Sequence, residues 1–162
     1  MESPIGTLTL VKSNGVLCGL YMDHHAGADA AITGVRVQSG FDEVAGQLTE
    51  YFSGQRTAFS FPIAPAGTPF QQRVWQALRA IPYGETRSYG QLAEAIGHPS
   101  AVRAVGAANG RNPISIVVPC HRVIGGKGAL VGYGGGLERK RFLLELEGAA
   151  LPLSRYTLRH FC

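Results

Sequence analysis

A cysteine and a histidine stand side by side in the run Pro119-Cys120-His121-Arg122-Val123. A thiolate is a strong nucleophile, and a neighbouring imidazole with nearby cations favours it over the thiol, whose ordinary pKa is about 8.5. The apolar residues 114–118 precede this run and are typical of a short buried strand. We therefore predict that a strand delivers Cys120 to a covalent reaction. The alternative is an inert buried cysteine, which is the commoner role of a single cysteine after an apolar strand.

Glycines and two acidic residues accompany this cysteine along the chain. Residues 125–128 and 132–136 are rich in glycine, which lets the backbone approach a ligand closely, although a flexible surface loop would have the same composition. Glu145 and Glu147 fall in the last turn of a helix expected at residues 137–147, where a carboxylate opposes the helix dipole. A carboxylate in that place is suited to orienting a histidine. Solvated glutamates without a role are the alternative.

The first 64 residues read as strands and one helix. Asn14-Gly15 lies between two apolar runs, which is a strong hairpin signal. Helical spacing of apolar residues predicts a helix at residues 42–52, and alternation at residues 59–63 predicts a half-buried strand. We interpret residues 1–64 as a small α/β support domain and residues 65–68 as a linker, because Pro65 and Gly67 interrupt any regular element.

Residues 69–150 carry denser helix signals. Thr68 and Gln71 form a capping box before one helix, and Ser88 and Gln91 form a second before residues 89–96. A further helix is expected at residues 99–108, so that two short helices joined at Gly97 have the form of a helix-turn-helix. An ordinary helical corner is the alternative.

The second helix of this pair is unusual for what it lacks. A helix that reads the major groove presents several long polar side chains to base edges. Residues 99–108 offer mainly alanine and glycine, with Arg103 as the only long side chain. This composition favours sequence-independent contact with the minor groove, with one arginine available to enter the base stack.

Charge is distributed unevenly along the chain. Residues 1–68 hold three Lys or Arg and six Asp or Glu, whereas residues 69–162 hold twelve and five. The basic C-terminal part suggests a polyanionic partner, although a basic surface without a ligand would look the same.

Composition also argues against several classes of protein. Three cysteines without paired spacing indicate neither a disulfide framework nor a metal centre, and the adjacent His24 and His25 are more typical of a solvated turn. The start of the chain has no basic segment followed by a long apolar run, so we expect neither secretion nor a membrane, and therefore a cytoplasmic protein. We expect no cofactor.

The motifs together resemble one family. The run PCHRV, preceded by RNP and followed by GYGGG, is similar to the O6-alkylguanine-DNA alkyltransferases, also called methylated-DNA–protein-cysteine methyltransferases. The resemblance is continuous from Phe70 to Gly148 through YGETRSYGQLA, the RAVG helix and the ending LLELEG, and SPIGTLTL fits the family's N-terminal domain more loosely. It implies a mixed α/β (α+β) fold with an RNase H-like N-terminal domain and a DNA-binding domain at residues 69–150. Residues 151–162 form an unmatched tail.

The resemblance also implies a reaction and the residues that perform it. A methyl or larger alkyl group on O6 of guanine, or on O4 of thymine, in duplex DNA would pass irreversibly to Cys120 after the base is flipped out. His121 would take the thiol proton through a water molecule, Glu147 would orient His121, and Asn112 would brace the preceding turn. Lys140 matches a lysine needed for activity. Tyr89 and Tyr133 would donate hydrogen bonds to the leaving guanine, and the backbone carbonyls of Cys120 and Val123 would accept from its amino group.

Further residues are assigned to DNA and to the pocket by the same resemblance. Arg103 would fill the space that the flipped base leaves. The other DNA contacts would be Tyr89, Ser100, Ala101, Ala104 and Arg111. The pocket would be lined by Ser115, Val123, Tyr133 and Gly134. Where the family often has proline this chain has Ser115, which predicts a wider pocket that accepts bulkier adducts, as in the bacterial Ogt-like branch. We expect a monomer, with cooperative binding along DNA left open.

Two other classes of function stay open from the sequence. A non-catalytic alkyltransferase-like protein would bind lesions without repairing them, but those relatives lack the cysteine that stands at position 120. An unrelated Cys-His hydrolase would turn over many substrates and would not need DNA-binding helices.

Overall fold

The computed structural model describes residues 1–25, 32 and 34–151. The N-terminal part holds an antiparallel sheet of β1 (Glu2–Ser3), β2 (Gly6–Ser13) and β3 (Val16–Met22), in the order β1-β2-β3. Asn14 and Gly15 both have positive φ, at 50° and 78°, as a tight two-residue hairpin turn requires. The hairpin predicted from Asn-Gly is therefore confirmed.

Helix α2 (Asp42–Phe52) has the bounds that its apolar spacing predicts. It buries Val44, Leu48 and Tyr51 and ends before Gly54, whose φ of 76° suits a glycine. The strand predicted at residues 59–63 is wrong: only Ile63 pairs, in an isolated parallel bridge to Leu17. The alternation marks alternating burial there, but Pro62 has no N–H to continue a ladder.

The C-terminal part begins with α3 (Pro69–Arg79) and α4 (Tyr89–Ala95), and both predicted capping boxes are present. Helix α5 (Val102–Gly110) begins three residues later than predicted, because Pro99 lies in the turn that precedes it rather than in its first turn. Trp75 of α3 donates from Nε1 to the carbonyl of Ala108 at 2.9 Å, which fixes α5 against α3.

The segment before the cysteine is not a strand, contrary to the prediction for residues 114–118. It forms turns in which Val118 N donates to Ile114 O at 3.0 Å and Ile116 has a φ of 73°. Ile114, Ile116 and Val118 are buried because the turn packs into the core, not because it pairs in a sheet. One isolated bridge joins Ile114 to Leu20 of β3.

The turn leads into the 3-10 helix η1 (Cys120–Arg122) and β5 (Val123–Ile124), which pairs in parallel with β4 (Arg87–Ser88). This small sheet was not predicted, because each strand has only two residues and its partner lies far along the chain. Helix α6 (Leu137–Leu146) follows and stops before Gly148, with Glu147 as its C-cap.

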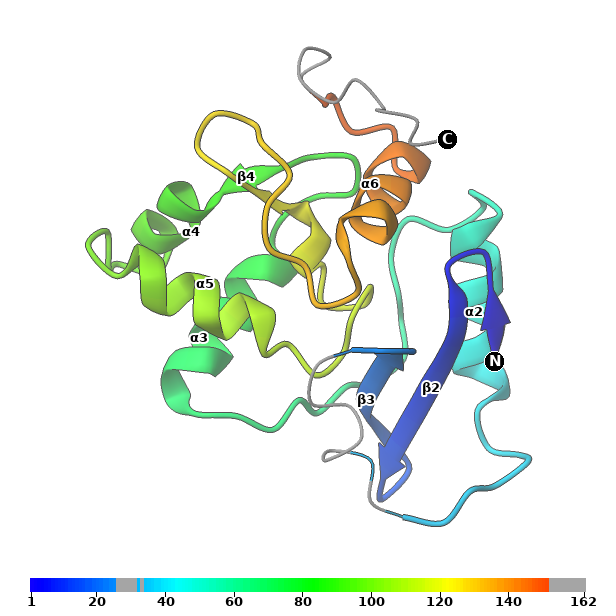
Figure 1. The fold of residues 1–162 in the computed structure, drawn as a ribbon. Coiled ribbons are helices and arrows are strands. Elements are labelled where there is room, and N and C mark those ends of the chain that lie inside the picture. Colours follow the sequence, from blue (N-terminus) through cyan, green and yellow to red (C-terminus); the bar gives the residue numbers. More distant parts are fainter. Residues whose placement is uncertain (26–31, 33, 152–162) are drawn as a thin grey trace.

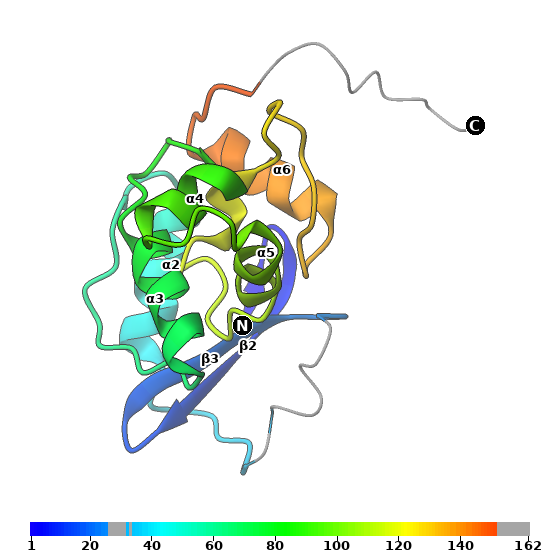
Figure 2. The same ribbon diagram turned by 90° about the vertical axis from the view of Figure 1, so that its left-hand side faces the viewer.

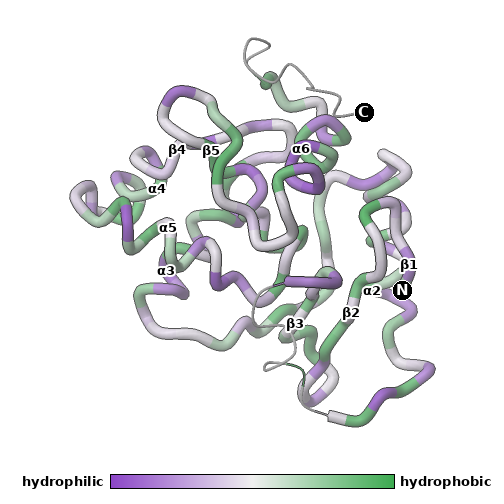
Figure 3. The backbone as a smooth tube through the Cα atoms, in the orientation of Figure 1, coloured by the Kyte–Doolittle hydropathy of each residue, from purple (hydrophilic) through white to green (hydrophobic). Residues whose placement is uncertain are grey.

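Figure 1 shows the two parts side by side, with β2, β3 and α2 on one side and α3, α4 and α5 on the other. In Figure 2 these last three helices lie on the face turned toward the viewer. Apolar stretches follow β2 and β3 in Figure 3, and buried residues of both parts join in one hydrophobic core. In the described ranges no helix is long and apolar enough to cross a membrane.

Candidate active site

Cys120 is the first residue of η1, and only 5% of it is exposed. The turn before it is held by Asn112, whose Nδ2 donates to Val118 O at 2.7 Å and to Cys120 Sγ at 3.1 Å. Asn112 Oδ1 accepts from Ile114 N at 3.0 Å. One buried amide therefore fixes both the turn and the sulfur, which is the geometry expected of a bracing residue.

The protonation state of Cys120 differs from the sequence expectation. Burial raises the pKa of its thiol, while the hydrogen bond from Asn112 and the charge of Lys140 act in the opposite direction. Because burial is the largest of these effects, the resting group is a thiol and not the thiolate predicted from neighbouring cations. A nucleophilic reaction at this sulfur therefore needs a base.

His121 is suited to be that base. Its Nε2 lies 2.7 Å from Glu147 Oε1, and both side chains are fully buried. Burial alone would raise the pKa of Glu147, but hydrogen bonds from His121, Arg122 and Tyr51 hold it well below its ordinary value. Since an ionised carboxylate only accepts, Nε2 carries the hydrogen and Nδ1 keeps its lone pair. Nδ1 is buried and makes no hydrogen bond within the described part of the chain.

The same imidazole is held in its neutral form. Burial lowers the pKa of His121, and the nearby charges of Arg122 and Lys140 lower it further, against the opposing effect of Glu147. A neutral, correctly oriented ring is what a general base requires.

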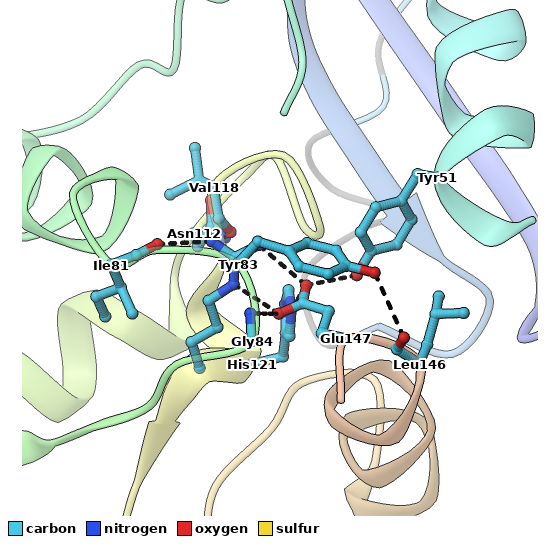
Figure 4. A network of polar contacts seen from close by, with 10 residues as sticks. Tyr51, Ile81, Tyr83, Gly84, Asn112, Val118, His121, Leu146 and Glu147 are labelled. Atoms are coloured by element: carbon cyan, nitrogen blue, oxygen red, sulfur yellow. Dashed lines mark hydrogen bonds and ion pairs between the residues drawn. The ribbon is translucent and has the colours of Figure 1, made fainter. Parts of the chain in front are cut away.

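Glu147 accepts from a wider set of donors than the sequence suggested. Oε2 accepts from Arg122 Nε at 2.8 Å and Gly84 N at 3.3 Å, and Oε1 accepts from Arg122 Nη2 at 3.0 Å and Tyr51 Oη at 2.7 Å. Figure 4 shows Tyr51 reaching Glu147 on one side and His121 and Gly84 on the other. Sequence reasoning assigned no role to Arg122, although it stands inside the cysteine motif, and the sequence holds no signal for Tyr51.

Glu145, the other acidic residue of this region, has a different environment. It is exposed and pairs with Arg141 one turn earlier at 2.7 Å. Glu145 therefore belongs to a solvated surface ion pair, whereas Glu147, two positions later, is a buried residue of the site.

Lys140 is fully buried and points its ammonium group at backbone carbonyls. Its Nζ donates to Val131 O at 2.8 Å and also to Val123 O. It thereby joins the two ends of residues 123–131, which include the first glycine-rich segment. Burial lowers the pKa of Lys140 to about 8, against the opposing effect of Cys120. The Val123 carbonyl expected to contact guanine is therefore bonded to Lys140 in this structure.

Tyr133 lies within the second glycine-rich segment, and Tyr89 contacts the start of this segment. Tyr89 Oη donates to Val131 O at 3.3 Å, and Tyr133 Oη lies 4.0 Å from Met22 Sδ. Burial, and after it the nearby Cys120, raises the pKa of both phenols, so both stay protonated and can donate. A Cβ at Gly134 would lie 2.5 Å from His25 Nε2, which explains glycine at that predicted pocket position.

The remaining predicted residues separate into an outer and an inner group. Arg103 and Ala104 on α5, Ser100 before it and Arg111 after it are exposed, and Ala101 is half-buried. Ser115 and Val123 are buried near Cys120 in the chain, and Ser115 N donates to Leu20 O at 3.2 Å. The structure thus brings the cysteine, histidine, glutamate and asparagine together and leaves the α5 residues available at the surface. The described residues hold no group of three or more His, Cys, Asp or Glu arranged for a metal ion.

Comparison with known proteins identifies the same family over nearly all of residues 1–149. Residues 69–149 match the DNA-binding domain of 6-O-methylguanine DNA methyltransferase, and residues 1–65 match its ribonuclease-like domain. The chain belongs to this family.

Individual relatives cover nearly all of the chain. The methylated-DNA–protein-cysteine methyltransferase of Mycobacterium leprae is 54% identical over 91% of this chain and 89% of its own length. The constitutive enzyme of Bacillus subtilis is 47% identical over 90% and 92%. The crystal structure of Mycobacterium tuberculosis OGT in complex with DNA is 52% identical, with a TM-score of 0.86 over 94% of this chain and 93% of that one. These matches confirm the family resemblance and the mixed α/β fold.

We expect Glu147→Gln to destabilise the protein by about 3–5 kcal/mol at pH 7, because Arg122 would lose its buried carboxylate. The pKa of Glu147 is lowered on folding, so its stabilisation is present above about pH 4.3 and is lost as the pH falls further. The difference in the free energy of unfolding between variant and wild type should therefore become smaller as the pH falls below about 4.3. Urea unfolding at pH 7 and at successively lower pH values measures this difference.

Glu145→Gln is the matched control. It removes a carboxylate whose pair with Arg141 is about half exposed on both sides, so it should cost less than about 1 kcal/mol. Equal losses of unfolding free energy in Glu145→Gln and Glu147→Gln would contradict the importance of the buried hydrogen bonds to Glu147.

Proposed function

We propose that this protein repairs duplex DNA by moving an alkyl group from O6 of guanine irreversibly onto Cys120. The observation that carries the proposal is the pair of hydrogen bonds Asn112–Cys120 and His121–Glu147, in a chain whose relatives are named for methyl transfer to a protein cysteine. A relative of the same fold has been crystallised with DNA. Transfer of an alkyl group from O4 of thymine to Cys120, and residence in the cytoplasm, remain predictions.

The geometry of the site supports the following reaction. His121 Nδ1 accepts the Cys120 proton, through a water molecule, and the sulfur attacks the alkyl carbon in line with its bond to O6. The S–C bond forms as the C–O6 bond breaks, and the released electron pair and one proton leave with guanine. The products are an S-alkyl cysteine and unmodified guanine. A thioether has no easy hydrolytic exit, so each molecule reacts once.

Two tyrosines and one lysine support this step. The leaving guanine gains negative charge, and the protonated phenols of Tyr89 and Tyr133 can donate to it. Lys140 holds residues 123–131 in place and favours the developing thiolate.

DNA must present a base that has left the stack, because the alkyl carbon is inaccessible inside a duplex. The exposed face of α5 carries small residues that permit a close approach to the minor groove, and Arg103 on that face is the side chain long enough to replace the flipped base. Tyr89 connects this helix with the pocket. Its ring lies beside Gly106 of α5, where a side chain would be in van der Waals contact with it, and its hydroxyl donates to Val131 O.

Mass spectrometry tests the transfer directly. After incubation with duplex DNA carrying O6-methylguanine, we expect one methyl group per molecule on the tryptic peptide that contains Cys120, and no further turnover with excess substrate. Cys120→Ser should bind the same DNA and stay unmodified. Tight binding by the wild type without methylation would favour a non-catalytic lesion-binding protein. Multiple turnovers would favour a hydrolase.

Arg103→Ala should slow transfer from duplex DNA by about tenfold or more, because base flipping costs a few kcal/mol and loses its stabilising side chain. Reaction with the free base O6-benzylguanine should be unchanged. Arg141→Ala, which removes one positive charge from α6, is the control. Equal slowing of both substrates by Arg103→Ala would contradict a role in flipping.

Ser115 should govern adduct size. We expect Ser115→Pro and Ser115→Val to lower the ratio of benzyl to methyl transfer from duplex DNA, because both add bulk at this buried position. Proline also removes the hydrogen bond from Ser115 N to Leu20 O, whereas valine keeps it. The ratio in single-turnover assays separates the two effects, since loss of the backbone bond should slow both adducts alike. An unchanged ratio in both variants would show that this position does not set the size limit.

A further inference from the structure

Tyr51 belongs to α2, in the part of the chain to which the sequence assigned only support. Its side chain is buried, and its hydroxyl donates to Glu147 Oε1 at 2.7 Å across 96 residues of sequence. Figure 4 shows this phenol entering the network from the side opposite to His121. A side chain of the N-terminal part therefore touches the carboxylate that orients the base.

We propose that Tyr51 is a positioning residue for the alkyl transfer. By donating to Glu147, it weakens the electrostatic stabilisation that this carboxylate gives to a second proton on His121, and so keeps the imidazole neutral. The proposal rests on the proposed function, since it concerns the base of that reaction.

The competition takes place at one oxygen atom. Glu147 Oε1 accepts from Tyr51 Oη, His121 Nε2 and Arg122 Nη2, at 2.7, 2.7 and 3.0 Å. Donors that share an acceptor each reduce its remaining negative potential. Removing the Tyr51 hydroxyl leaves a stronger acceptor for the imidazole proton, and this stabilises the imidazolium form.

The other charged and titratable groups around this pair lie on several elements. Arg122 on η1 and Lys140 on α6 disfavour a second proton on His121, whereas Glu147 favours it. Two further phenols and the thiol sense the same charges: Tyr83, Tyr133 and Cys120. Only Tyr51 among the three phenols donates to Glu147 within the described residues.

Phenylalanine at position 51 would remove the hydroxyl and keep the ring, so that the effect of the hydroxyl can be measured by itself. The Tyr51 ring packs against Phe52, Phe59 and Tyr83 with centroid distances of 5.4, 5.5 and 6.2 Å, and these contacts do not need the oxygen. Tyr83 offers a matched control, because its hydroxyl points to Leu146 O at 3.4 Å rather than to Glu147.

The test is the pH dependence of the single-turnover rate constant with duplex DNA carrying O6-methylguanine. Transfer needs neutral His121, so the rate falls in acid. Tyr51→Phe should move the midpoint of this acidic limb of the pH–rate profile upward by about half a pH unit. The rate constant should therefore be about threefold lower at pH values below the midpoint and unchanged near pH 9. Tyr83→Phe should leave the limb in place. NMR titration of His121 without DNA should show the same shift.

A second variant should shift the acidic limb in the opposite direction. Site-specific replacement of Tyr51 by 3-fluorotyrosine keeps the ring and makes a stronger donor, so the acidic limb should move downward. This variant keeps the proposal testable if Tyr51→Phe does not fold.

The outcomes separate the two proposals. A wild type that acquires no methyl group on Cys120 overturns the proposed function, and the His121 titration then still tests Tyr51. An unchanged limb and titration in both Tyr51 variants would overturn the role of Tyr51, even if Tyr51→Phe is less stable. Equal shifts in Tyr51→Phe and Tyr83→Phe would overturn it as well.

Discussion

The buried carboxylate of Glu147 is the constraint on which the rest of the site depends. A charge without water is costly unless donors surround it, and its donors come from α2, the loop before β4 and η1. These segments must therefore meet at the C-terminal end of α6. The helix dipole is unfavourable for an acid there, and the cluster of donors offsets this cost. The position that looked wrong for a helix is thus explained by tertiary contacts.

The network also explains how a single-use reagent is kept intact. A permanent thiolate would be open to oxidation and to reaction with the wrong electrophile. Burial instead keeps Cys120 as a thiol, and His121 stays neutral beside an ionised partner. In the proposed reaction, His121 takes the proton as the sulfur attacks the alkyl carbon. Reactivity is thereby tied to the presence of substrate.

The sequence predicted what local chemistry determines. The Asn14-Gly15 turn and the two capping boxes depend on neighbouring residues only, and all three are as predicted. The reaction was predicted from the family resemblance of the segment from Phe70 to Gly148, because a lone cysteine after an apolar run does not by itself indicate a nucleophile. Residues 114–118 were taken for a strand because apolar composition reports burial and not hydrogen bonding. Tyr51 could not be found, since nothing within α2 indicates a partner 96 residues away.

The contacts between the N-terminal part and the catalytic part include backbone bonds and side-chain bonds, which place different requirements on the sequence. Leu20 bonds to Pro113 and Ser115 through backbone atoms alone. Arg139 pairs with Asp23, and Tyr51 donates to Glu147, and these two need particular side chains. Most of the N-terminal surface can therefore change while the turn before Cys120 stays attached to β3.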